Sequence, residues 1–147
     1  MTDLKQLVHE ALDRLREERT GCFVHNAGAA ELLEYGTDAI AAIENEVLAL
    51  AEPGRRPRDL VSVMVIYSQL LRKFEVGNRA VTFLRRLPQS FREDAIGGAC
   101  GAWHLHFPTP CTLPGSIRDY LEELRQNGTE LERRTATKIL QRDDKFA

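Results

Sequence analysis

The stretch Leu60-Val61-Ser62-Val63-Met64-Val65-Ile66-Tyr67 is the most apolar part of the sequence, and it decides the fold class. Its many β-branched residues are also typical of a strand. The apolar pattern continues, however, through Leu70, Leu71 and Phe74 at helical spacing, and no other segment resembles a partner strand. We therefore predict a helix over residues 60–74. Because this helix is apolar nearly all round, we expect it to be the buried centre of the fold.

Helical periodicity continues on both sides of this segment. Leu4, Leu7, Ala11 and Leu15 fall on one helical face and predict an N-terminal helix. The same spacing predicts a short helix at 31–35 and longer ones at 37–51, 78–87, 90–104, 116–126 and 129–141. The sequence thus predicts an all-α fold.

Turn residues mark the ends of these elements. Thr129 and Glu132 have the spacing of a capping box, in which each side chain bonds the backbone N–H of the other residue. Gly128 stands where a left-handed C-cap is expected. Residues 20–30 and 52–58 combine glycine or proline with polar side chains, so we expect them to be the most mobile internal loops.

Length and composition indicate a single globular unit. The chain has 147 residues, of which 43% are hydrophobic and 29% charged. A chain of this length can bury a sizeable core. We predict one helical domain over 1–147, with residues 1–35 forming N-terminal capping helices.

Charge and cysteine content argue against several classes of protein. The net charge of −2 provides no basic surplus for nucleic-acid binding. No apolar run approaches the roughly 18 residues that span a bilayer. Three cysteines are too few for a disulfide scaffold. We expect a soluble cytoplasmic protein without a cofactor, and neither a nucleic acid nor a membrane as its partner.

From residue 36 onward the predicted helices fall into pairs. They are 37–51 with 59–74, 78–87 with 90–104, and 116–126 with 129–141, and the first members begin about 40 residues apart, a period typical of helical solenoids. Residues 36–43 (GTDAIAAI) match residues 77–84 (GNRAVTFL), with glycine, alanine and two aliphatic residues in register.

On these grounds residues 36–142 resemble a short HEAT-like or armadillo-like array. The resemblance implies an α-solenoid of stacked antiparallel helix pairs with a concave protein-binding face, and it implies no universal catalytic residues. Gly97, Gly98 and Gly101 depart from it because they fall inside a repeat helix. An irregular helical bundle is the alternative architecture.

One cluster has the residue types that bind zinc. Cys100, His104, His106 and Cys111 supply four thiol and imidazole groups, although their spacing matches no standard zinc motif. Cys22 and His25 form a second pair that could complete such a site. The alternative is that Cys100 is a small buried hydrophobe. We predict that folding requires no metal, and we keep a small metal-binding protein or metalloenzyme as the alternative function.

Other catalytic signatures are missing from the sequence. The glycine-rich stretch 97–102 lacks the ending of a phosphate-binding loop, so we interpret it as a packing seam against the central helix. Paired acids such as Asp143-Asp144 are expected on solvated faces. No GxSxG nucleophile elbow is present.

By exclusion, the sequence favours a non-enzymatic protein-interaction domain, for example of the immunity or adaptor type. In stacked helix pairs the second helices line the concave side. We therefore predict partner binding through Arg92, Arg133 and Arg134, with an acidic protein segment as the partner. The alternative is that these arginines pair with glutamates on neighbouring turns, such as Glu130 or Glu132.

Overall fold

The computed structural model describes residues 6, 10, 32–50, 60–101, 103 and 112–146. Its helices are α3 (Thr37–Leu50), α4 (Leu60–Lys73), α5 (Asn78–Arg85), α6 (Gln89–Gly101), α7 (Gly115–Asn127) and α8 (Glu130–Phe146). The described residues contain no strand, so the prediction of an all-α fold is confirmed. The predicted loops 20–30 and 52–58 lie outside the described residues.

Only parts of the N-terminal region are described. Gln6 and Glu10 are helical, and the amide of Gln6 donates a hydrogen bond to the Glu10 carboxylate over 3.2 Å. Residues 32–34 are helical too, with the fully buried Leu32 packed into the core. None of the helices described is long and apolar enough to cross a membrane.

Helix α4 is the buried centre of the fold, as its apolar sequence predicts. Val63, Ile66 and Leu70 are at most 2% exposed. The helix packs against α6 most extensively, and also against α3 and α5. Since neighbours cover it on several sides, β-branched residues that would suit a strand here fill space in a helical core.

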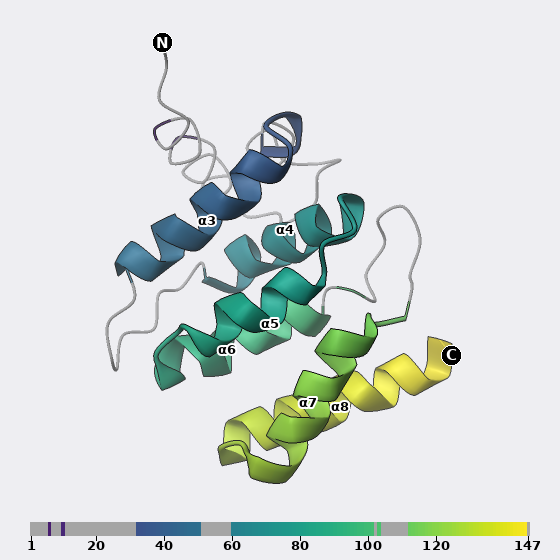
Figure 1. Cartoon of the computed structure of the whole chain (residues 1–147). Helices are drawn as coiled ribbons and strands as arrows, with labels where there is room; N and C mark the ends of the chain where they lie inside the picture. Colours follow the sequence, from purple (N-terminus) through teal and green to yellow (C-terminus); the bar gives the residue numbers. More distant parts are fainter. Residues whose placement is uncertain are drawn as a thin grey trace.

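The contacts between the other helices follow a regular order that starts at α4. Helix α6 packs on α4, and α8 packs on α6. Each of these three helices also contacts the helix that precedes it in sequence, namely α3, α5 and α7 in turn. Figure 1 shows α3 and the α7–α8 hairpin on opposite sides of the α4–α6 unit.

A tight connection leads from α4 into α5. The backbone N–H of Val76 bonds the carbonyl of Leu71 over 2.9 Å, and that of Glu75 bonds the carbonyl of Arg72 over 3.3 Å. This is the Schellman arrangement, with Glu75 in the left-handed position at φ +57°. Buried Gly77 follows, where a Cβ would lie 2.9 Å from the Pro114 ring.

The connection between α7 and α8 confirms one prediction and corrects another. The Thr129 hydroxyl accepts from the Glu132 N–H over 3.2 Å and the Glu132 carboxylate accepts from the Thr129 N–H over 3.1 Å, so the capping box is present. Gly128, however, is extended (φ −77°, ψ 177°), and the predicted left-handed cap is wrong. Glycine is required for another reason, because a Cβ would lie 2.5 Å from the Leu124 carbonyl oxygen.

The glycines of α6 also differ from expectation. The helix does pack on α4, but a Cβ on Gly97 would meet nothing described, and one on Gly101 would lie 3.8 Å from Ile139 of α8. These two glycines therefore form no seam against the central helix. At position 101 a Cβ would make an ordinary van der Waals contact with α8, so the packing there does not require glycine.

The central position of α4 yields a first prediction. We expect Ile66→Ala to lower the free energy of unfolding by about 2–5 kcal/mol, since it removes buried methyl groups from a closely packed site. Val65→Ala, one residue away and only half-buried, is the matched control and should cost less. Urea unfolding at equilibrium measures both. A loss below about 1 kcal/mol for Ile66→Ala would contradict the central role of α4.

Candidate functional site

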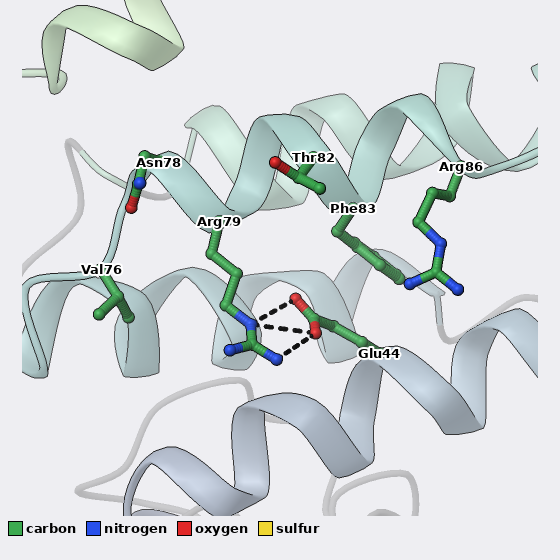
Figure 2. A pocket seen from close by; sticks show the side chains of 7 residues that line it. All are labelled: Glu44, Val76, Asn78, Arg79, Thr82, Phe83 and Arg86. Carbon is green, nitrogen blue, oxygen red and sulfur yellow. Dashed lines mark hydrogen bonds and ion pairs between the residues drawn. The ribbon is translucent and has the colours of Figure 1, made fainter.

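A buried carboxylate connects helices α3, α4 and α5. Glu44 of α3 is 7% exposed and accepts a hydrogen bond from the Tyr67 hydroxyl of α4. It also accepts from Arg79 of α5, over 2.9 Å from Nε and 2.7 Å from Nη2 (Figure 2). Burial, reinforced by the bond to Glu44, raises the pKa of Tyr67 far above its ordinary value. Tyr67 is therefore protonated at neutral pH and donates to Glu44.

A hollow of about 440 Å³ lies beside this ion pair, between α3 and α5. The residues that line it are Glu44, Val76, Asn78, Arg79, Thr82, Phe83 and Arg86. In Figure 2, Arg79, Phe83 and Arg86 extend from α5 toward α3, and Glu44 rises from α3 to meet Arg79. The guanidinium of Arg86 makes no hydrogen bond or ion pair in the part of the chain that is described. The hollow thus has one uncompensated positive charge.

A second buried carboxylate joins α6 to α8. Glu132 is 1% exposed and accepts from the Nε of Arg92 over 2.9 Å, in addition to its bond within the capping box. Burial raises the pKa of Glu132, but the hydrogen bonds from Arg92 and Thr129 outweigh it and lower the pKa below the ordinary value. Arg92, a predicted partner-binding residue, is therefore held in an internal ion pair.

Arg92 also lines a smaller hollow, of about 290 Å³, with Arg85, Tyr120, Glu123 and Leu124. Arg85 lies over the Tyr120 ring, 4.9 Å from its centroid, and pairs with Glu123 over 2.7 Å. A guanidinium above an aromatic face is a favourable cation–π contact. These contacts connect α5 to α7.

Arg133 and Arg134 lie together on the exposed face of α8. With Glu130, Thr137 and Lys138 they line an open hollow of about 500 Å³. Arg134 approaches Glu130 only at 3.5 Å, and the Arg133 side chain has no ion pair among the described residues. Of the three predicted arginines, the structure thus brings two to one hollow and places Arg92 at another.

Asp143 has a structural role that the sequence patterns did not indicate. It is 3% exposed and accepts from the backbone N–H of Leu113 over 2.7 Å and from the guanidinium of Arg118. The expectation of a solvated acid is therefore wrong for Asp143, although Asp144 is exposed. Helical periodicity could have found it, because position 143 lies four residues after the buried Ile139.

Cys100 is fully buried, as its interpretation as a small hydrophobe predicts. Burial raises the pKa of its thiol to about 12. Zinc binds the thiolate, so this environment disfavours a ligand role. His104, His106, Cys111, Cys22 and His25 lie outside the described residues. Within those described, no group of three histidine, cysteine or acidic residues is placed to hold a metal.

Comparison with known proteins found no match to any protein-family model, curated protein or solved structure.

The Glu132 geometry generates a second prediction. We expect Glu132→Ala to cost about 2–4 kcal/mol of stability at neutral pH, because it removes both the cap and a charge-assisted bond. Glu130→Ala, two residues earlier and exposed, should cost under ~1 kcal/mol. Urea unfolding of both variants provides the measurement, and equal losses would contradict the assignment.

The second prediction includes a pH dependence of the same carboxylate. Since folding lowers the pKa of Glu132, its stabilising effect is present above the ordinary value of 4.5 and is lost as the pH falls through the folded value. The stability difference between the wild type and Glu132→Gln should therefore shrink from neutral pH to about pH 3. A difference that grows on acidification would show that the sign is wrong.

A third prediction concerns metal. We expect excess chelator to leave the melting temperature unchanged, because the core is formed by apolar side chains and by ion pairs. Thermal unfolding with and without chelator, together with elemental analysis of the purified protein, tests this expectation. Stoichiometric zinc with unfolding on chelation would overturn it.

Proposed function

We propose that this chain is a non-enzymatic protein-interaction domain that binds an acidic segment of a partner protein through α8. The observation that carries the proposal is the hollow lined by Arg133, Arg134 and Lys138, where Glu130 is the one acidic group. Guanidinium groups bind carboxylates through two parallel hydrogen bonds, so an acidic segment is the complementary partner.

The charge pattern along α8 supports the same surface. Lys138 and Arg142 follow Arg134 at intervals of four residues, and all three are exposed. Like charges at this spacing destabilise a helix by about 0.2–0.5 kcal/mol per pair. Opposite charges on a bound partner would relieve this repulsion. Arg92 is not part of the proposed surface, because it lies at a different hollow and is already neutralised by Glu132.

The helix arrangement fits this role. Helix α4 packs on α6, and α6 packs on α8. Each of these three helices also contacts the helix that precedes it in the chain. Such an order is what an α-solenoid of the HEAT-like kind would have, with α4, α6 and α8 as its row of second helices. We propose this architecture, with an irregular helical bundle as the alternative, and an adaptor- or immunity-type role in the cytoplasm.

The fourth prediction tests the α8 surface with a fluorescent oligoglutamate as the probe. We expect replacement of Arg133 and Arg134 together by glutamine to weaken binding about 2- to 30-fold, the effect of two surface ionic contacts. The melting temperature should change by less than about 3 °C, since neither side chain is buried. Fluorescence anisotropy at low ionic strength measures the affinity.

Replacement of Lys73 and Arg125 together by glutamine is the matched control, because it also removes two exposed positive charges and neither residue lines the α8 hollow. Equal weakening by the control and the double variant would show non-specific attraction and would overturn the proposed surface. Tighter binding of a single-stranded oligonucleotide than of oligoglutamate, with the same dependence on Arg133 and Arg134, would favour nucleic acid as the partner. A large drop in melting temperature would show that the two arginines are structural.

A further inference from the structure

We propose that the hollow between α3 and α5 is a second binding site, which takes a small organic carboxylate. In this site the guanidinium of Arg86 binds the carboxylate, and the apolar part of the ligand lies toward the half-buried Val76. The proposal is independent of the α8 surface, because the two hollows share no residue.

The charges in the hollow select an anion. The Glu44 carboxylate is compensated, since it accepts three hydrogen bonds from Arg79 and one from Tyr67. Those bonds use the Nε and Nη2 of Arg79 and leave its Nη1 outside the pair. Arg86 adds a second guanidinium with no described ion pair or hydrogen bond. The hollow therefore has a net charge of about +1, with unused donors, before a ligand enters.

The packing of the helices accounts for the space. Helix α3 packs on α4, while its contact with α5 is slight compared with the contacts of α5 to α6 and α7. The Arg79–Glu44 ion pair spans the interval between α3 and α5 (Figure 2). A volume of about 440 Å³ is within the range of roughly 300–1,000 Å³ for small-molecule sites.

The lining favours a carboxylate with an apolar portion. The half-buried Val76 is apolar, the almost fully buried Phe83 closes the hollow from inside, and the amide of Asn78 and the hydroxyl of Thr82 add neutral polar groups. Arg86 provides the planar fork that matches a carboxylate through two hydrogen bonds. An ammonium at this position would be a point charge without that fork.

The fifth prediction uses 3-phenylpropionate as the probe, followed by amide chemical shifts of the isotope-labelled protein. We expect shifts centred on residues 76–86. Acetate, which lacks the apolar part, and 3-phenylpropanamide, which lacks the charge, should each bind more weakly. Arg86→Gln should weaken phenylpropionate binding about 10-fold or more, and Arg86→Lys by less, because a charge-assisted bond is lost in the first and a charge is retained in the second.

The variant with Arg133 and Arg134 replaced by glutamine is the control, and it should bind phenylpropionate as the wild type does. Shifts scattered over the surface, or unaffected by Arg86→Gln, would overturn the proposal. Tighter binding of inorganic phosphate than of phenylpropionate at the same residues would overturn the carboxylate class. Failure of oligoglutamate to bind α8 would leave this result unchanged, so the two proposals fail separately.

Discussion

A carboxylate that leaves water on folding must be met by donors inside the protein, and this constraint orients the helices relative to one another. Glu44, Glu132 and Asp143 are the buried acids of the described chain. Each accepts from an arginine on a different helix, respectively Arg79, Arg92 and Arg118. Apolar burial supplies the main driving force, but it is non-directional. The three ion pairs have defined geometry, so they select one arrangement of the helices among those that would bury the same apolar faces.

The same constraint sorts the arginines into two groups. Those that meet a buried acid are committed to the structure, because removal of the arginine leaves a carboxylate that water cannot easily reach. Others, such as Arg86 and Arg133, have no ion pair among the described residues. A cation of the second kind can pair with an outside ligand at little cost to the fold. Both proposed binding surfaces are built on this second group.

Local sequence patterns predicted where most of the described helices lie. They could not predict which residues far apart in the sequence form ion pairs. Helical spacing placed α4 and its neighbours, and the three-residue interval between Thr129 and Glu132 predicted the cap that is observed. The sequence could not show which acid would meet Arg92, because Glu132 lies 40 positions away. Gly128 was assigned to the wrong backbone region because its requirement is steric contact with Leu124, which depends on how the chain enters α8. The hollow beside Arg86 also depends on contacts between residues far apart in the sequence, so no local pattern predicted it.

The two intervals on either side of α5 show how the type of contact affects the size of a hollow. Toward α7 the hollow is smaller, about 290 Å³, and Arg85 lies over the Tyr120 ring, 4.9 Å from its centroid. Toward α3, the connection is the long Arg79–Glu44 pair, whose extended side chains span a distance that apolar side chains would close by interdigitation. The buried Tyr67 hydroxyl of α4 also donates a hydrogen bond to Glu44. This bond holds the carboxylate between α3 and α5. The hollow beside Arg86 is thus a consequence of placing a buried acid at this helix junction. The interaction that orders the fold there also keeps the site open.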